Sequence, residues 1–245
     1  MEDLEPIDIL GDEHVQIWLE TCKIVKNYFG DEIFVRGNCD QAPFALASMI
    51  RSIEGWMMDL FLNEEYVFKL LDYSSEISGQ FIKLVAATGV DMVSNGDSPA
   101  GPALISPEMY RKFALPYEKK MADIAHEQKL PYLLHICGNT DSILEDMVKT
   151  GADAIELDYE TDIIKVHNIC KNYITFFGNI DPSGVIALGT PELVEEKVRQ
   201  LLSVYNVSPR FVMNAGCAIP VITPSENIEQ LVHITKNHLI DKYIL

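Results

Sequence analysis

The chain has 245 residues, of which 48% are hydrophobic and 23% are charged, an ordinary composition for a soluble globular protein. Its 37 acidic and 19 basic residues give a formal net charge of −18, which argues against nucleic acid and anionic membranes as partners because both attract positive surfaces. The N-terminal segment MEDLEPIDIL is acidic, no apolar run approaches the roughly 18 residues of a membrane span, and the five cysteines form no C-x-x-C pair, so we expect a cytoplasmic protein without disulfides.

Short apolar runs alternate with helical patterns along the chain. We predict strands at 33–37, 90–96, 131–136, 153–158, 173–179 and 210–216. Over 64–88 apolar residues recur every three or four positions, which predicts a helix with one apolar face. A hydroxyl residue followed by proline and an acid predicts further helix starts at Ser106, Thr190 and Thr223, the last with a capping box to Glu226 and a closing helix over 225–238.

This alternation predicts an α/β fold with a mostly parallel sheet, either an open doubly wound sheet or a (β/α)8 TIM barrel. No G-x-G-x-x-G follows a strand, which disfavours the dinucleotide-binding form of the open sheet. Polar residues end nearly every predicted strand, as in a barrel, where chemistry gathers at the carboxyl ends of the strands. These residues are Asn38, Asn95, Asp97, His135, Asp158, Asn179, Asp181 and Asn214.

The six predicted strands are two fewer than a closed barrel needs. We therefore predict a single partial TIM-barrel domain over residues 1–245 that lacks the first two N-terminal βα units. Its first and last strands would be exposed edges, which proteins normally cover. The chain is then a fragment, a shortened gene product, or a protein whose edges are covered by a partner, for instance in a homo-oligomer.

The segment LLHICGNT, residues 133–140, combines a strand with two potential metal ligands. If the strand stays extended through residue 137, His135 and Cys137 lie on the same face. Cys217, in the segment NAGCAIP after the last predicted strand, supplies a third ligand. A set of one histidine and two cysteines leaves a position open, as in catalytic zinc sites, and sulfur favours zinc over magnesium or calcium. The alternative is a hydrogen-bonded histidine beside inert buried thiols. Cys39 also follows a predicted strand.

Four segments resemble the uroporphyrinogen decarboxylase superfamily, from about residue 30 to the end of the chain. They are GNIDP (178–182), LDYETD (157–162), LISPEMYRKFALPY (104–117) and the pattern GC-x-x-P-x-x-TP-x-EN (216–227). The resemblance implies a (β/α)8 barrel of the uroporphyrinogen decarboxylase type, in agreement with the predicted architecture.

Two branches of this superfamily differ at the candidate metal site. The decarboxylases have a glycine–histidine–glycine turn where this chain has Gly216-Cys217-Ala218, and they lack the H-x-C pair. The methyltransferases that move a methyl group from a methyl-corrinoid protein to a thiol such as coenzyme M have H-x-C and a distant cysteine, which bind Zn²⁺. His135, Cys137 and Cys217 match that pattern. The resemblance thus implies a zinc-dependent methyltransferase with a corrinoid protein as partner, methylcobalamin or another corrinoid as methyl donor, and a small thiol as substrate.

Further site residues are candidates on the same grounds. Asp158 would be a fourth zinc ligand or an acceptor for His135, with a turn or cap carboxylate as the alternative. Asp97 is a second candidate catalytic acid. Asn179 and Asp181 are candidates for cofactor binding, or they hold the turn after their strand.

Two other functions remain open. The first is a decarboxylase-like lyase that acts on a carboxylated tetrapyrrole, and the second is a truncated inactive homologue that binds a corrinoid protein. A pocket for many carboxylates needs several arginines. The chain has five, and we expect Arg199 and Arg210 on the wrong side of the barrel, so the lyase is the weaker candidate.

Overall fold

The computed structural model describes residues 4–5, 7–205 and 208–243, with side chains up to residue 238. Six strands in this part of the chain form one parallel sheet in sequence order, each strand pairing with the next. They are β1 (Arg36–Gln41), β2 (Met92–Gly96), β3 (Tyr132–Ile136), β4 (Ala154–Leu157), β5 (Thr175–Ile180) and β6 (Phe211–Ala215). The predicted α/β barrel-type fold with two strands fewer than a closed barrel is confirmed.

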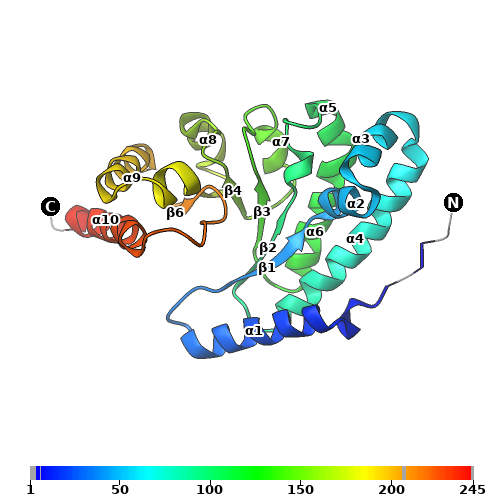
Figure 1. The fold of residues 1–245 in the computed structure, drawn as a ribbon, viewed down its shortest axis with the longest axis horizontal. Helices are drawn as coiled ribbons and strands as arrows, with labels where there is room; N and C mark the ends of the chain where they lie inside the picture. Colours follow the sequence, from blue (N-terminus) through cyan, green and yellow to red (C-terminus); the bar gives the residue numbers. More distant parts are fainter. Residues whose placement is uncertain (1–3, 6, 206–207, 244–245) are drawn as a thin grey trace.

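Helices cover the outer face of this sheet (Figure 1). The helices and helical turns are η1 (Ile9–Gly11), α1 (Glu13–Phe29), α2 (Pro43–Arg51), α3 (Ile53–Leu62), α4 (Glu64–Ala86), η2 (Ser98–Ala100), α5 (Pro107–Met109), η3 (Tyr110–Ala114), α6 (Leu115–Glu127), α7 (Leu144–Val148), α8 (Ile163–Cys170), η4 (Pro182–Ala187), α9 (Pro191–Tyr205) and α10 (Ser225–Tyr243). In Figure 1, α2 to α6 stand on one side of the sheet, α9 and α10 on the other, and α1 runs along the bottom. None of the described helices is both long and apolar enough to cross a membrane.

The main core lies between the sheet and these helices. Large fully buried side chains such as Leu70, Leu71, Ile82 and Phe176 belong to it. The barrel side of the sheet carries a second, small apolar cluster made of Met92, Leu133 and Ala154, with Phe177 packed against it. The inner face is therefore apolar at its lower end, and polar residues occupy the carboxyl ends of the strands.

The first strand differs from its prediction. We predicted 33–37, whereas β1 spans Arg36–Gln41, because the strand reads RGNCDQ and turns polar side chains toward the barrel interior. Cys39 therefore lies inside the strand rather than after it, and its side chain is buried.

The predicted capping hydroxyls are confirmed at two of three helix starts. The Ser106 and Thr190 hydroxyls accept hydrogen bonds from the backbone N–H groups of Met109 and Leu193. The third helix, α10, begins at Ser225 as predicted. The Thr223 hydroxyl, however, donates to the carbonyl of Pro220, so the predicted cap and capping box at Thr223 are wrong.

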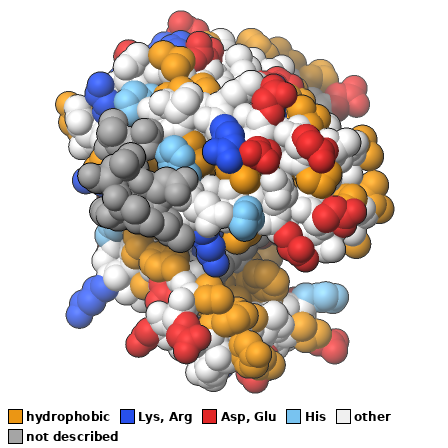
Figure 2. All heavy atoms as spheres, turned by 90° about the vertical axis from the view of Figure 1, so that its left-hand side faces the viewer, with side chains coloured by type: hydrophobic (Ala, Val, Ile, Leu, Met, Phe, Trp, Pro, Cys, Tyr) orange, Lys and Arg blue, Asp and Glu red, His pale blue; other side chains and the backbone are white. Residues whose placement is uncertain are grey.

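The open side of the barrel lies between β1 and β6, which each pair with one strand only in the described part of the chain. A cavity of about 550 Å³ at the lower end of the interior is lined by Phe34, Phe177 and Val212, among others. Figure 2 shows a hollow on this side in which hydrophobic side chains gather. Helix α1 also exposes Ile17, Ile24 and Tyr28.

Candidate metal centre

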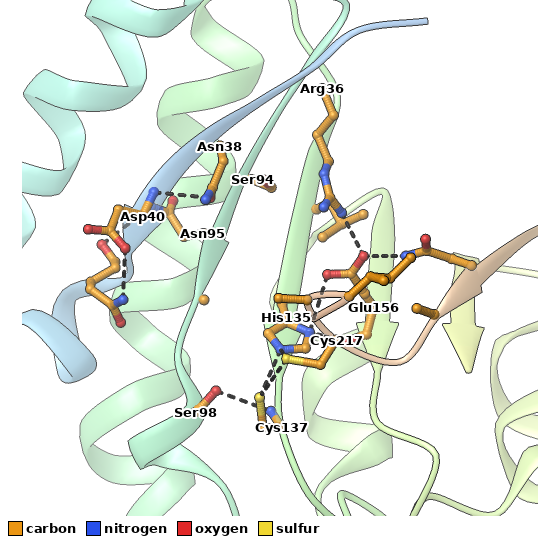
Figure 3. A pocket seen from close by; sticks show the side chains of 17 residues that line it. Arg36, Asn38, Asp40, Ser94, Asn95, Ser98, His135, Cys137, Glu156 and Cys217 are labelled. Carbon is orange, nitrogen blue, oxygen red and sulfur yellow. Dashed lines mark hydrogen bonds and ion pairs between the residues drawn. The ribbon is translucent and has the colours of Figure 1, made fainter. Parts of the chain in front are cut away.

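Three side chains predicted as metal ligands converge at the carboxyl end of the sheet (Figure 3). His135 is on β3, Cys137 follows this strand, and Cys217 lies in the loop after β6. His135 Nε2 is 3.0 Å from the Sγ atom of Cys137 and 3.7 Å from that of Cys217, and the two sulfurs are 3.5 Å apart. These atoms form the only group of three or more potential metal ligands found among the described residues.

Local hydrogen bonds hold the two cysteine-bearing segments in place. The backbone N–H of Cys137 donates to the Ser98 hydroxyl at 3.2 Å, and that of Gly138 donates to Asp158 Oδ2 at 3.0 Å. On the other segment, the N–H of Gly216 donates to the carbonyl of Ile180 at 2.8 Å. Both turns are therefore fixed by backbone contacts that leave the sulfur atoms free to face each other.

The imidazole of His135 is oriented by Glu156. Its Nδ1 lies 3.0 Å from the backbone carbonyl oxygen of Glu156 and 3.4 Å from the carboxylate oxygen Oε2. Two acceptors beside Nδ1 keep a proton on that nitrogen, and Nε2 faces the two sulfurs. A metal ion at Nε2 requires this proton on Nδ1 and would replace the second proton, which Nε2 donates to Cys217 in the metal-free cluster.

The three groups also share protons. A hydrogen bond from Cys137, together with one from His135, lowers the pKa of Cys217 to about 4. The same contact with Cys217, helped by burial, raises the pKa of Cys137. Burial lowers the pKa of His135, but the hydrogen bond with Cys217 and the charge of Glu156 outweigh it, so the pKa is raised overall. A thiolate, the form of cysteine that binds metals, is thus favoured at Cys217.

Glu156 was missed by the sequence analysis, as were its partners. It lies in the middle of the buried strand β4 and is itself 7% exposed. Its Oε1 accepts hydrogen bonds from Arg36 on β1, at 2.8 Å, and from the side chain of Asn214 on β6. An ionisable residue inside the apolar run AIEL is the signal that could have found it, because a buried charge needs partners.

Asp158 is close to the cysteines, but it does not accept a hydrogen bond from His135, which was one of its two predicted roles. Register pairs His135 with Glu156, so Glu156 and not Asp158 accepts from the imidazole. One carboxylate oxygen of Asp158 accepts from Gly138, while Oδ1 is buried and has no hydrogen-bond partner. Since Gly138 directly follows Cys137, this hydrogen bond keeps Asp158 near that thiol, and the charge of Asp158 contributes to the raised pKa of Cys137.

The other predicted site residues lie outside the cluster. Asp97 is fully buried, and its Oδ1 accepts from the backbone N–H of Ala45 near the start of α2, at 2.7 Å. The side chain of Asn179 donates to the backbone carbonyls of Asp158 and Thr161. Asp181 accepts from two backbone N–H groups of η4, those of Ser183 and Gly184. For Asn179 and Asp181, these contacts favour the alternative that they hold turns.

A cavity of about 530 Å³ opens beside the three candidate ligands. Its walls are formed by the carboxyl ends of strands and the loops that follow them. They carry the candidate ligands, the Arg36–Glu156 pair, and uncharged polar side chains such as Asn38, Ser94 and Asn95. Among the residues that the structure describes, Arg36 is the only lysine or arginine that lines it. The cavity could therefore hold a small polar molecule against the sulfur atoms.

Comparison with known families finds a match to the uroporphyrinogen decarboxylase (URO-D) family over residues 1–238. The family match therefore begins well before residue 30, where the motifs alone placed its start. A methylcobamide:CoM methyltransferase, MtbA, of Methanosarcina acetivorans is 36% identical over 240 residues, which are 97% of this chain and 69% of the relative. A uroporphyrinogen decarboxylase of Prochlorococcus marinus is 33% identical over 171 residues, which are 69% of this chain and 48% of the relative.

The fold is shared with a solved methyltransferase structure from Methanosarcina mazei. The two superpose with a TM-score of 0.84 at 23% sequence identity, over 97% of this chain and 71% of the other. At this identity the likeness concerns the fold.

Proposed function

The chain belongs to the uroporphyrinogen decarboxylase family, and we propose that it is a zinc-dependent methyltransferase that moves a methyl group from a methyl-corrinoid protein to a small thiol such as coenzyme M. The observation that carries this proposal is the convergence of His135, Cys137 and Cys217 at the edge of a cavity. Support also comes from the 36% identity to a methylcobamide:CoM methyltransferase.

The donor set fits zinc. With Zn–S of about 2.3 Å and Zn–N of about 2.0 Å, tetrahedral geometry separates two sulfurs by about 3.8 Å and a sulfur from the nitrogen by about 3.5 Å. The corresponding separations here are 3.5 Å between the sulfurs, and 3.0 and 3.7 Å to the nitrogen. Asp158 accepts from the backbone N–H of Gly138, the residue after Cys137, and its other carboxylate oxygen is buried without a hydrogen-bond partner among the described residues, so it is our candidate for the fourth ligand when no thiol is bound.

The chemistry then follows from the residues around the cavity. When bound, zinc would keep the acceptor thiol deprotonated at neutral pH, since an ordinary thiol has a pKa of about 8.5. The polar walls would orient the rest of the acceptor. In the transfer, a sulfur–carbon bond forms while the carbon–cobalt bond of the donor breaks. The electron pair of that bond stays on cobalt, and the thiol proton leaves for solvent beforehand.

The methyl donor and the cellular location are part of the same proposal. The corrinoid protein would approach the mouth of the cavity, because a methyl group on cobalt must come within bonding reach of the acceptor sulfur. All five cysteines are free, which suits a reducing cytoplasm, where we place the protein.

A decarboxylase-like lyase is the second candidate, because a decarboxylase is among the relatives. The cavity argues against it. Within the described part of the chain, Arg36 is the only lysine or arginine lining the cavity, and it is paired with Glu156. A substrate with many carboxylates would have few partners there. An inactive homologue that only binds a corrinoid protein is the non-enzymatic alternative.

Metal content tests the proposal most directly. Purified protein should contain about one zinc per chain by elemental analysis, and Cys137→Ser and Cys217→Ser should each lose it while the circular dichroism spectrum is kept, because a catalytic zinc seldom holds a large barrel together. Cys22→Ala, on α1, is the control and should retain zinc. Stoichiometric zinc in both serine variants would contradict the ligand set, and wild-type protein without zinc would favour the lyase.

Activity separates an enzyme from an inactive homologue. Methyl transfer from free methylcobalamin to coenzyme M can be followed by the change in corrinoid absorbance. We expect turnover by the wild type and none by Cys217→Ala. Absence of turnover by zinc-loaded wild type would favour the binding-only alternative.

A further inference from the structure

The carboxylate of Glu156 occupies a central position in the sheet. It projects from β4 into the barrel interior, where Arg36 and Asn214 reach it from the two edge strands, β1 and β6 (Figure 3). On its other side, Oε2 is 3.4 Å from Nδ1 of His135. One buried acid thus contacts both open edges of the sheet and the imidazole of the candidate metal centre.

Nothing in the proposed reaction requires an acid at this place. Glu156 stands behind the imidazole, on the Nδ1 side, whereas the sulfur atoms lie on the Nε2 side. It is therefore placed to act through His135 rather than on a metal ion or a methyl group. A carboxylate beside the second nitrogen of a metal-binding histidine fixes the ring and increases its basicity.

The charges around Glu156 are balanced. A carboxylate near two cysteine thiolates would repel them unless a cation stood close by. Arg36 supplies this cation at 2.8 Å. The ion pair therefore presents the Glu156 carboxylate to His135 without adding net charge to the cavity. Asn214 donates to the same oxygen, Oε1, and so leaves Oε2 free to face the imidazole.

We propose that Glu156, held by Arg36 and Asn214, is a positioning residue that orients and polarises His135 for metal binding. This inference rests on the proposed zinc centre, because it concerns the affinity of that centre. The inference adds Arg36 on β1, Glu156 on β4 and Asn214 on β6 to the site. It also implies that zinc affinity depends on the contacts between these three residues across the barrel interior.

The test compares zinc affinity with stability. In Glu156→Gln the shape is kept and the charge removed, and chelator competition should show zinc binding weakened 10- to 100-fold. Glu118→Gln makes the same isosteric change at another buried glutamate, away from the cavity, and its zinc affinity should stay within twofold of wild type. Replacing zinc by Co²⁺ gives a second readout, since the ligand-field bands of the metal should shift in Glu156→Gln alone.

A double-variant cycle separates positioning from a merely structural ion pair. Arg36→Met leaves a buried acid without its cation, so it should lower the midpoint of urea unfolding. In Arg36→Met/Glu156→Gln neither charge remains, and the unfolding midpoint should recover. Zinc affinity should stay as weak as in Glu156→Gln, because His135 still lacks its carboxylate.

Two results would overturn this inference alone. Zinc affinity equal to wild type in Glu156→Gln would do so while leaving the proposed function intact. Recovery of affinity together with stability in the double variant would show that the pair serves the fold only. If wild-type protein bound no zinc at all, the proposed function and this inference would both fail.

Discussion

Gly216 brings the two halves of the candidate site into contact. A β-carbon at this position would lie 2.9 Å from the backbone nitrogen of Tyr159 and 3.1 Å from both the Asp158 Cα and the Leu157 carbonyl oxygen. These are backbone atoms, which cannot rotate away as a side chain can. The absence of a side chain therefore lets the loop after β6 lie against the end of β4, with Cys217 next in the chain.

We expect Gly216→Ala to displace Cys217. The added methyl group must push the two loops apart, so zinc affinity should fall at least tenfold and the free energy of unfolding by about 1–3 kcal/mol, as for other overpacking changes. Gly11→Ala is the matched control, because a β-carbon there meets nothing within 4 Å. Chelator competition and urea unfolding measure the two effects, and unchanged zinc affinity in Gly216→Ala would contradict the argument.

At the scale of single residues, the sequence identified the candidate metal ligands better than the residues that hold them in place. The three candidate ligands stood out because soft donor atoms follow strand ends in recognisable motifs. Glu156 did not, because its importance comes from Arg36 and Asn214, which are 120 and 58 residues away in the chain. Asp97 follows a strand as a cavity residue would, yet its side chain turns into the core, which strand-end position alone cannot reveal.

At the scale of secondary-structure elements, two buried acids connect β2 to α6. Asp97 directly follows β2, and Glu118 lies on α6. Both side chains are fully buried, and the hydroxyl of Tyr110 donates to Glu118. Burial raises the pKa of Asp97 to about 7, and burial together with the charge of Asp97 raises the pKa of Glu118 further above its usual range. The pair therefore holds a proton at neutral pH, carried by Glu118.

Stability should consequently fall as pH rises. Both acids bind protons in the folded protein at pH values where they are ionised in the unfolded chain, so their contribution is complete below about pH 4 and is lost through pH 7 and above. The slope approaches 1.4 kcal/mol per pH unit for each proton, as an order of magnitude. In Glu118→Gln one of the two titrating acids is removed and its charge no longer acts on Asp97, so the free energy of unfolding should depend less on pH.

Urea unfolding of both proteins at pH 5.5 and 8.5 measures this difference. We expect Glu118→Gln to gain stability relative to wild type at the higher pH. Other titrating groups are common to the two proteins and cancel in the comparison. Parallel pH profiles would mean that the two carboxyl groups share no proton.

Elements whose side chains serve the cavity were the hardest to place from sequence. Strands β2 to β6 were found because each contains adjacent apolar residues. Strand β1 was placed too early, because the apolar residues 33–35 precede it while Arg36 and Asn38 face the cavity from within it. Strand propensities reflect how well side chains pack on a half-buried sheet surface. A strand that lines a polar cavity has no such packed surface on that side.

For the whole molecule, the sequence predicted both the barrel type and the number of strands. It also predicted that the first and last strands are exposed edges, and β1 and β6 each pair with one strand only in the described part of the chain. What it did not identify are the apolar side chains exposed on this side. Phe34, just before β1, is 61% exposed, and Val212 on β6 is 39% exposed, whereas sequence alone makes such side chains look like core residues.

We expect a second copy of the chain to cover this side. Exposed apolar groups beside unpaired strand edges favour association, whereas a net charge of −18 opposes it. Salt screens the repulsion over a Debye length of about 8 Å at 0.15 M, so association should strengthen as salt is added. Sedimentation velocity at micromolar concentrations should therefore show a dimer that gains population with both protein and salt.

A pair of matched substitutions locates the contact. Phe34→Asp puts a charge on the open side and should weaken dimerisation at least tenfold, since the new carboxylate would lose water on association. Phe61→Asp adds the same charge on α3, at a side chain that is 77% exposed and belongs to the opposite flank of the sheet, and should leave dimerisation unchanged. A monomer at every salt and protein concentration, or equal effects of the two substitutions, would contradict this assignment. Since the open side and the candidate ligands lie in the same barrel interior, zinc content measured on the separated monomer and dimer would then show whether closing the gap also completes the metal centre.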